Sequence, residues 1–326
     1  AIIMAGGKGQ RFWPLSTESR PKQFLDLGQD GRTLLQSTYD RILPLVGSPS
    51  NVFITTASQY VHLVREQLPH LSAENILVEP TGRDSAPAVA FATLEIEGRL
   101  GPCTCGVFSA DHRILDSHRF HEVIEQAKYL AESEGGLVTV GINPTQPATG
   151  YGYIEQGSSV GPGFKVKQFI EKPNSEKAQQ FLDGGRHFWN AGIFVWESSV
   201  VLAELDRHSP DLMKALRRAR DSNTVSAVFP SLPKISVDYA LMERTDKAYV
   251  VPGNFDWDDI GDWAALERLL GRSPDGANTV VGQHVGLEAR GNIIYTESPD
   301  DVVVTLGVEN LVVVKRGNTV LLLPKN

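Results

Sequence analysis

The stretch that decides the fold is Ala1-Ile2-Ile3-Met4-Ala5-Gly6-Gly7-Lys8-Gly9-Gln10-Arg11-Phe12-Trp13-Pro14-Leu15. Its apolar start predicts a short buried strand, and the glycines after it allow positive φ angles and a close approach of the backbone to a ligand. Successive N–H groups in such a turn form a concavity that binds anions, and Lys8 and Arg11 add positive charge there. The stretch therefore predicts a strand followed by a phosphate-binding loop.

Two common phosphate-binding loops do not match this stretch. A dinucleotide-binding loop needs a third glycine where Phe12 stands, and the Gly-Lys-Ser/Thr ending of a Walker loop is absent from the stretch. The remaining alternative to a phosphate loop is a plain glycine-rich turn between a strand and a helix.

Short β-rich runs alternate with longer helical patterns up to about residue 272. Strands are expected at residues 1–4, 52–56, 106–109, 137–141 and 192–196. Helices are expected at residues 33–43, 59–68, 86–98, 119–132 and 199–206. This alternation predicts a Rossmann-like α/β fold with a mixed, mostly parallel sheet flanked by helices, in which ligands bind beyond the carboxyl ends of the strands.

The pattern changes after Leu270, where a linker rich in glycine, proline and aspartate begins. Only short β-like runs follow, at residues 302–305, 311–315 and 319–323, and Arg290-Gly291-Asn292 recurs as Arg316-Gly317-Asn318, which suggests repeated β turns. We therefore expect a catalytic domain at residues 1–272 and a small all-β, β-helix-like domain at residues 273–326.

The composition excludes several classes of protein. The 326 residues are 41 % hydrophobic and 21 % charged, with a net charge of −8, as in a globular protein that has no general affinity for nucleic acid or anionic membranes. No apolar run reaches the roughly 18–20 residues of a membrane span, and we expect no leader segment before the first strand. Cys103 and Cys105 are too close in sequence for an easy disulfide and too few for a zinc site, which favours reduced thiols and a cytoplasmic location.

Two loops after expected strands carry polar residues. Asp111 follows the strand at residues 106–109 and is suited to Mg²⁺, which prefers hard oxygen ligands, although a helix cap is an equal alternative. Asp84 or Ser85 suits the N-cap of the helix that contains Pro87 in its first turn, so a simple helix start explains that segment as well.

Taken together, the motifs resemble those of the sugar-1-phosphate nucleotidyltransferases. The resemblance is carried by Ala5-Gly6-Gly7-x-Gly9-x-Arg11 and by Pro21-Lys22-Gln23-Phe24, whose ending is similar to that of the mannose-1-phosphate guanylyltransferase branch. Eight motifs in the expected order extend the resemblance over most of residues 1–263. It implies transfer of GMP from GTP to α-D-mannose 1-phosphate, with GDP-mannose and pyrophosphate as products.

The resemblance also implies roles for residues on the nucleotide side. Arg11 and Lys22 would contact the nucleotide phosphates, with backbone amides from Gly6, Gly7 and Gly9. Pro80, Asp84 and Ser85 would lie near the guanine base. Asp111 and Asp259 would hold Mg²⁺, and Asp256 and Asp258 are the competing carboxylates for the second position.

On the sugar side, the resemblance implies a second group of residues. Gly152 and Glu171 would contact the sugar, Lys172 would hold its phosphate, and Asn190 would orient its hydroxyls. Residues 236–243 resemble a guanylyltransferase stretch, and an amphipathic helix with a serine cap is the alternative there.

Other interpretations stay open. A zinc site at His118 and His121 is disfavoured, because no third ligand is evident. Another sugar 1-phosphate or nucleotide, such as glucose 1-phosphate or ATP, and a noncatalytic sensor of sugar nucleotides are the functional alternatives. We also hypothesise that the β tail forms a homodimer, which light scattering of a chain ending near Leu270 would test.

Overall fold

The computed structural model describes residues 1–7, 9–271 and 277–325 and divides into two compact units. Unit 1 comprises Ala1–Gly6, Thr38–Ala110 and Ile114–Trp257, and unit 2 comprises Gly7–Ser37, Asp111–Arg113 and Asp258–Asn326. The boundary expected between residues 272 and 273 lies outside the described residues, as does Lys8.

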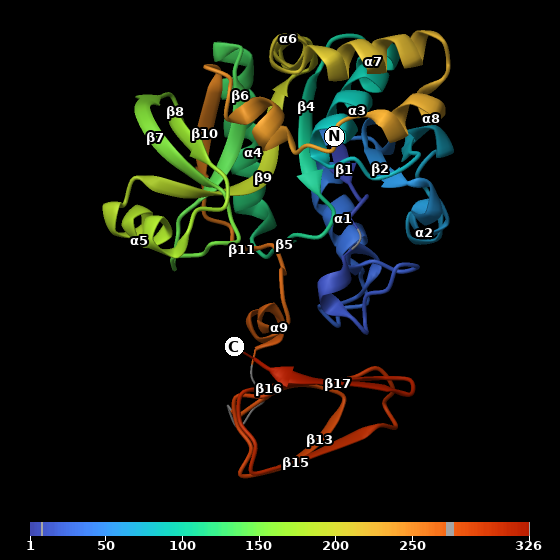
Figure 1. Ribbon diagram of the computed structural model, residues 1–326, viewed down its shortest axis with the longest axis vertical. Helices are drawn as coiled ribbons and strands as arrows, with labels where there is room; N and C mark the ends of the chain where they lie inside the picture. Colours follow the sequence, from blue (N-terminus) through green and yellow to red (C-terminus); the bar gives the residue numbers. More distant parts are fainter. Residues whose placement is uncertain (8, 272–276, 326) are drawn as a thin grey trace. The chain divides into compact units, whose positions relative to one another are not determined.

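Unit 1 is built on a mixed sheet, with nine strands among the described residues (Figure 1). Their spatial order is β3 (Ile76–Glu79), β2 (Phe53–Ala57), β1 (Ile2–Met4), β4 (Thr104–Ser109), β9 (His187–Glu197), β6 (Leu137–Ile142), β10 (Ala248–Gly253), β8 (Gly163–Ile170) and β7 (Tyr153–Val160). The strands β3, β2, β1 and β4 run parallel, and β9 pairs antiparallel with both β4 and β6.

The first strand has the buried position that its apolar residues predict. Ile2 and Ile3 are fully buried, and Ile2 pairs with Phe53 on one side and Val107 on the other. A strand between two parallel neighbours is covered on both faces, so a continuous apolar run suits it better than alternation does. The glycine loop therefore begins directly after β1, at the carboxyl end of this strand.

Nine α-helices occur among the described residues. They are α1 (Leu34–Val46), α2 (Val61–Gln67), α3 (Ser85–Leu100), α4 (Ser117–Glu134), α5 (Ser175–Gly184), α6 (Ser198–His208), α7 (Pro210–Asp221), α8 (Val225–Val228) and α9 (Ala264–Leu270). Helix α4 packs on β6, β9 and β10, while α3 packs against α6 and α7. None of the described helices is long and apolar enough to cross a membrane.

The expected helices all occur, and the chain also forms helices that were not predicted. Helix α7 is one of these, although Leu212, Met213, Leu216 and Ala219 recur at helical spacing and are buried. Residues 236–243 form a π-helical turn at Asp238–Met242 instead of a regular amphipathic helix.

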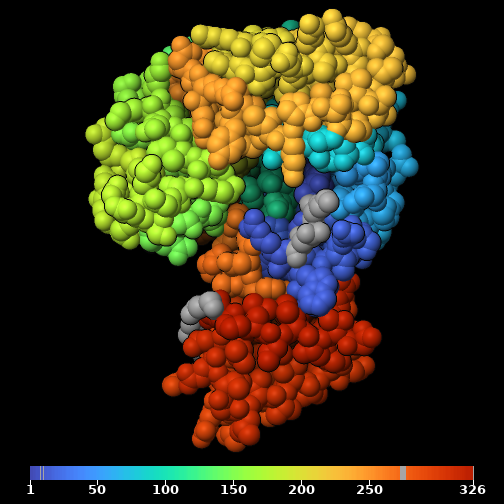
Figure 2. All heavy atoms as spheres, viewed as in Figure 1, coloured from blue at the N-terminus to red at the C-terminus, as the bar shows by residue number. Residues whose placement is uncertain are grey.

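The strands of unit 2 form two small sheets near the end of the chain, drawn red in Figure 2. One consists of β12 (Thr279–Val281), β14 (Ile293–Thr296), β16 (Leu311–Arg316) and β17 (Thr319–Pro324), and the other of β13 (Gln283–Leu287) and β15 (Val302–Leu306). The chain alternates between the two sheets from β12 to β16, and all pairings except β16–β17 are parallel, as in a β-helix.

The repeated Arg-Gly-Asn triplet does not mark a structural repeat. Asn292 is buried at a corner between turns of the β-helix, where its side chain donates to Asn278 and to the Val308 carbonyl. Asn318 instead lies in the hairpin between β16 and β17. The first copy therefore lies at a buried corner of the β-helix, and the second forms an antiparallel turn.

Unit 2 has its own hydrophobic core, which joins distant parts of the sequence. Phe12 and Leu15 from the segment after the glycine loop pack in one cluster with Trp263 near α9 and with Ile293 and Val312 from the β-helix. In addition, the Arg316 Nη1 donates to the Pro14 and Leu15 carbonyls at 2.7 and 2.8 Å. The C-terminal strands thus support the segment that carries Arg11.

Candidate active site

Lys22 ties together three distant segments of unit 2. It lies buried in a short 3₁₀ turn, and its Nζ is 2.8 Å from Asp111 Oδ2 and 2.9 Å from each of the Asp259 and Ile260 carbonyl oxygens. Because an ammonium group has three N–H donors, these three acceptors match its full capacity. Lys22 therefore holds Asp111 and the segment that begins at Asp259 close to each other.

The glycine loop packs directly on the same turn. Gly9 has a φ of +53°, and a Cβ on it would lie 2.5 Å from the Lys22 backbone nitrogen, so only glycine fits there. Next to Lys22, the Gln23 side chain donates to the Gly7 carbonyl at 2.8 Å. The second motif thus supports the backbone of the first.

The acidic segment after Trp257 contains carboxylates with different tasks. Asp258 accepts two bonds from the Arg268 guanidinium, from Nε at 2.5 Å and Nη2 at 3.2 Å, and one from the Ile260 amide. Asp262 accepts from the Ala265 amide at the start of α9. These bonds give Asp258 and Asp262 structural roles within the segment.

Arg11 lies at the same segment. Its Nη1 donates to the Gly261 carbonyl at 3.3 Å, and this guanidinium nitrogen would be 3.4 Å from a Cβ on Gly261. A side chain at position 261 would therefore press on Arg11 and on Asp259, whose carboxylate is at 3.0 Å from the same point. Arg11, Lys22, Asp111 and Asp259 form one cluster of opposite charges.

The donor set of this cluster suits magnesium better than zinc. Among the described residues, no group of three or more histidine, cysteine, aspartate or glutamate side chains is placed to hold a metal ion. Magnesium commonly binds through one or two carboxylates and completes its shell with water and substrate phosphates, so Asp111 and Asp259 fit it. The His121 side chain is bonded through Nε2 to the Arg41 carbonyl at 2.7 Å.

A second cluster of predicted residues lies in unit 1. Lys172 Nζ is 2.8 Å from Glu171 Oε1, and this ion pair is the main cause that raises the pKa of Lys172. Lys172 has a φ of +46°, a conformation that non-glycine residues rarely adopt and that occurs often at functional sites. Gly152 is in close contact with the same carboxylate, because a Cβ on it would overlap Glu171 Oε2.

Asn190 is held in one orientation within this cluster. Its Oδ1 accepts from the Thr139 hydroxyl at 3.0 Å and from the Gly192 amide at 3.1 Å. Its Nδ2 donates to Asp238 Oδ1 at 3.0 Å, and its backbone amide donates to the Gly152 carbonyl. The amide carbonyl of Asn190 is therefore engaged by the protein, and its NH₂ group is the part that can also meet a ligand.

Asp238 was not among the predicted site residues. Burial, followed by the nearby Glu171 carboxylate, raises the pKa of Asp238 to about 6. The resemblance of residues 236–243 to a guanylyltransferase stretch marked its segment, but that stretch gave Asp238 no role, because its bond to Asn190 joins residues 48 positions apart.

The segment expected near the base forms the start of α3. Asp84 caps the helix by accepting from the Ser85 amide at 2.8 Å, and Ser85 Oγ accepts from the Val237 amide at 2.8 Å. Pro80 lies half-buried directly after β3. Both interpretations of this segment are thus compatible with the geometry: a helix start, and an exposed edge that a base can approach.

Glu79, at the end of β3, is a second acidic residue that the sequence did not single out. It is buried, and burial raises its pKa to about 7. Its Oε1 would be 3.2 Å from a Cβ on Gly6, so the carboxyl group borders the beginning of the glycine loop.

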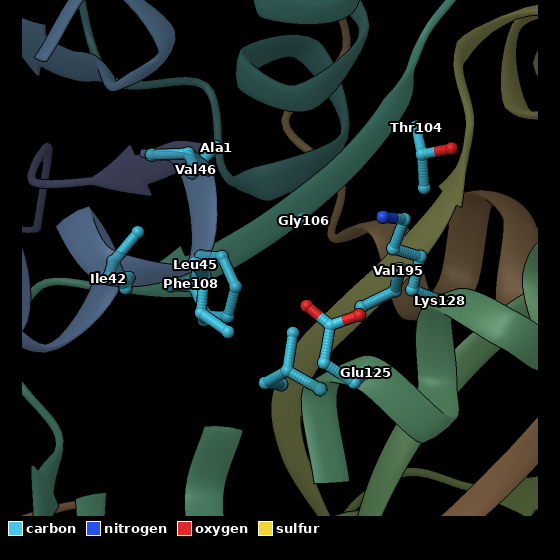
Figure 3. A pocket seen from close by; sticks show the side chains of 11 residues that line it. Ala1, Ile42, Leu45, Val46, Thr104, Gly106, Phe108, Glu125, Lys128 and Val195 are labelled. Atoms are coloured by element: carbon cyan, nitrogen blue, oxygen red, sulfur yellow. The ribbon is translucent and has the colours of Figure 1, made fainter. Parts of the chain in front are cut away.

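A cavity of about 120 Å³ in unit 1 is separate from these residues (Figure 3). Its walls are mostly apolar, with Leu45, Phe108 and Val195, and Glu125 and Lys128 from α4 also line it. None of the predicted site residues lines this cavity.

The predicted residues thus fall into two groups. Unit 2 brings together Gly7, Gly9, Arg11, Lys22, Asp111 and Asp259. Unit 1 holds Gly6, Pro80, Asp84, Ser85, Gly152, Glu171, Lys172 and Asn190, together with Asp238 and Glu79, which were not predicted.

Comparisons with known proteins cover the whole chain. Residues 1–271 match the family model described as nucleotidyl transferase, and residues 282–326 match the model described as the MannoseP isomerase/GMP-like beta-helix domain. The mannose-1-phosphate guanylyltransferase of Escherichia coli strain K12 is 40 % identical over 343 residues, which cover 100 % of this chain and 70 % of that protein. That of Salmonella muenchen is 38 % identical over 340 residues, with the same coverage.

A solved structure agrees with these relatives. A protein from Thermus thermophilus, described as mannose-1-phosphate geranyltransferase, superposes with a TM-score of 0.90 at 37 % identity and covers 99 % of this chain and 94 % of its own.

Proposed function

The chain belongs to the mannose-1-phosphate guanylyltransferases, and we propose that it transfers GMP from GTP to α-D-mannose 1-phosphate, releasing GDP-mannose and pyrophosphate. The observation that carries this proposal is the cluster of Arg11, Lys22, Asp111 and Asp259, which three segments far apart in the sequence build in unit 2.

The reaction makes modest demands on the protein. The sugar phosphate supplies the nucleophilic oxygen, which attacks the α-phosphorus in line with the departing pyrophosphate, so a covalent enzyme nucleophile is not required. The protein must position two polyanions and neutralise the charge that brings them together. A cluster of cationic side chains and backbone amides is suited to that task.

On the nucleotide side, the loop around Gly6, Gly7 and Gly9 would supply backbone amides to the phosphates. Arg11 would stabilise the departing pyrophosphate through charge-assisted hydrogen bonds. Lys22 would add positive charge to the nucleotide phosphates and, through its three bonds inside unit 2, keep Asp111 and the Asp259 segment in register. Pro80, Asp84 and Ser85 would face the guanine base.

Asp111 and Asp259 would hold a divalent cation, for which we propose Mg²⁺. When bound, the cation would act as a Lewis acid that neutralises phosphate charge. The two carboxylates would fix its place, and Lys22 would limit their mutual repulsion, because its ammonium group lies between Asp111 and the Asp259 backbone.

On the sugar side, Lys172 would bind the phosphate of the incoming sugar, since its long side chain is largely exposed beside Glu171. Glu171 would accept hydrogen bonds from two sugar hydroxyls, and the Asn190 NH₂ group would donate to another. Gly152 would leave room for this contact, because any side chain there would displace the Glu171 carboxylate.

The proposal extends to location and partners. It includes a cytoplasmic enzyme of two domains, residues 1–272 and 273–326, that binds neither nucleic acid nor membranes. It also includes a homodimer, for which β13 and β15 offer a surface: Val285, Leu287, Val302, Val304 and Leu306 are each more than half exposed on this parallel pair. Contiguous exposed apolar stripes of this kind often mark interfaces.

The test is a coupled assay for pyrophosphate with each of the four nucleoside triphosphates against mannose 1-phosphate and glucose 1-phosphate. We expect the highest kcat/KM for GTP with mannose 1-phosphate and no turnover without a divalent cation. Preference for another pair would point to a different nucleotidyltransferase, and absence of turnover with every pair would favour a sensor of sugar nucleotides.

A further inference from the structure

We propose that Asp238 is a second acidic residue of the sugar subsite, where it accepts a hydrogen bond from a hydroxyl of the hexose 1-phosphate and thereby helps to select the sugar. This inference deepens the function proposed above and rests on it.

The first support is the hydrogen-bond network. Asn190 Nδ2 donates to Asp238 Oδ1, while Asn190 Oδ1 is already used by Thr139 and Gly192. The one part of Asn190 that can meet a ligand is therefore the part that Asp238 orients. A hydroxyl within reach of this NH₂ group is also close to the carboxylate of Asp238.

The second support is the chemistry of the neighbours. Asp238 is in electrostatic contact with Glu171 and Lys172, Tyr239 follows it in the same π-helical turn, and Glu243 at the end of that turn also faces Glu171. An ionised carboxylate only accepts hydrogen bonds, and the hydroxyls of a hexose donate them. Two carboxylates on one small subsite therefore suit a ligand that presents several hydroxyl groups.

The third support is that the charged form of Asp238 is disfavoured in the folded protein. Burial and the Glu171 carboxylate both disfavour the charged form of Asp238 and raise its pKa to about 6. Proteins keep such unfavourable groups mainly where function needs them. A purely structural partner for Asn190 would be served as well by a neutral amide.

The kinetic test replaces Asp238 by its neutral isostere, Asp238→Asn. We expect the KM for mannose 1-phosphate to rise roughly 10- to 100-fold, as for loss of a hydrogen bond to a charged group, with kcat and the KM for GTP nearly unchanged. Asp246→Asn is the control, because it removes the negative charge of an exposed carboxylate that faces Arg207 and not Asn190; its KM should stay near that of the wild type.

The specificity test uses 2-, 3- and 4-deoxy mannose 1-phosphates. In the wild type, the analogue that lacks the hydroxyl bound by Asp238 should be penalised, and Asp238→Asn should abolish that one penalty while the others persist. If every penalty is unchanged in Asp238→Asn, Asp238 contacts no sugar hydroxyl and the inference is wrong.

The pH dependence provides a further readout. The carboxylate form is lost as pH falls through about 6, so the ratio of the variant's KM to the wild-type KM should shrink from pH 8 to pH 5. Taking the ratio cancels the titration of the substrate phosphate, which occurs in the same range. A ratio that does not change with pH would contradict the proposed contact.

Thermal stability tests the raised pKa of Asp238 without substrate, and calorimetric binding separates this inference from the proposed function. Because the folded-state pKa is raised, wild-type stability is lost as pH rises through about 6, and Asp238→Asn escapes that loss. The Tm of the variant relative to the wild type should therefore be higher at pH 8 than at pH 5. If the wild type forms no GDP-mannose, the proposed function fails, and calorimetric binding of mannose 1-phosphate and its deoxy analogues then decides the role of Asp238.

Discussion

Single residues of the acidic segment differ in their surroundings, and these differences bear on the proposal that Asp259 holds the metal ion. Asp258 is paired with Arg268, and Asp256 is exposed in unit 1 with a φ of +53°. Asp259 follows directly on Asp258, and its carbonyl is fixed by Lys22.

We expect Asp259→Asn to lower kcat by a hundredfold or more, on the order of the loss when a group that stabilises transition-state charge is removed. Asp256→Asn is the control, since asparagine tolerates the same positive φ, and its kcat should stay near that of the wild type. Steady-state kinetics with GTP and mannose 1-phosphate measure both. A large loss in Asp256→Asn together with an active Asp259→Asn would reverse the assignment.

At the scale of single residues, we also expect Glu79 to make the stability of the protein depend on pH. Burial raises the pKa of Glu79 from 4.5 to about 7 in the folded protein. The protonated carboxyl group therefore adds fully to the free energy of unfolding below pH 4.5, and this contribution is lost as pH rises through about 7. Glu79→Gln removes this loss, and its gain in unfolding free energy over the wild type should grow to about 3 kcal/mol at most by pH 8.

Urea unfolding at pH 5 and pH 8 measures the effect of Glu79→Gln. Glu74→Gln, at an exposed position just before β3, is the control and should show no such trend. If Glu79→Gln has the same advantage at both pH values, the carboxyl group of Glu79 does not titrate in this range.

At the scale of elements, the loop before β7 combines two glycines with different surroundings. A Cβ on Gly152 would overlap the Glu171 carboxylate, whereas a Cβ on Gly150 would meet no atom within 4 Å. The overlap involves only the end of a flexible side chain, so the strand can keep its place while Glu171 moves.

We therefore expect Gly152→Ala to raise the KM for mannose 1-phosphate roughly tenfold or more and to leave the KM for GTP and the Tm almost unchanged. Gly150→Ala should behave like the wild type in all three measurements. Equal KM values for the two variants would remove the contact between Gly152 and Glu171 from the sugar subsite.

The elements themselves were predictable to different degrees. The strands that precede the glycine loop and Asp111 are continuous apolar runs, and α4 shows its buried face in Phe120, Val123 and Ile124. The strand β7 was missed because it is half exposed and has few apolar residues, whereas the alternation Phe164-Lys165-Val166-Lys167 in β8 could have predicted a strand. The π-helical turn at Asp238 was missed as well, since its sequence also fits an amphipathic helix.

At the scale of the whole molecule, the β-helix has two structural roles in unit 2. It completes the core around Phe12 and Trp263, and it exposes the apolar stripe on β13 and β15. Removing everything after Leu270 would therefore disturb the core as well as the stripe, and substitutions on the stripe are the sharper test of the dimer.

We expect the wild type to have twice the 35.7 kDa chain mass in light scattering, and the double variant Val304→Lys and Leu306→Lys to have the mass of one chain. These side chains are 69 % and 67 % exposed, so lysines there should leave the fold intact and oppose the approach of a second stripe. Leu115→Lys, at a 56 % exposed leucine of unit 1, is the control. A double variant with wild-type mass would contradict the proposed interface.

From the sequence alone we could predict the alternation of the first strands and helices and the glycine loop, because each depends on residues close in sequence. The resemblance of its motifs to a known family supplied the candidates Arg11, Lys22, Asp111, Asp259, Glu171 and Asn190. The folded structure was needed to show that Arg268 engages Asp258, that Lys22 joins Asp111 to the Asp259 segment, and that Asp238 bonds to Asn190. These contacts join residues that lie from ten to more than two hundred positions apart, so no local sequence pattern encodes them. For the same reason, only the folded chain revealed that Phe12 near its beginning shares a core with Val312 near its end.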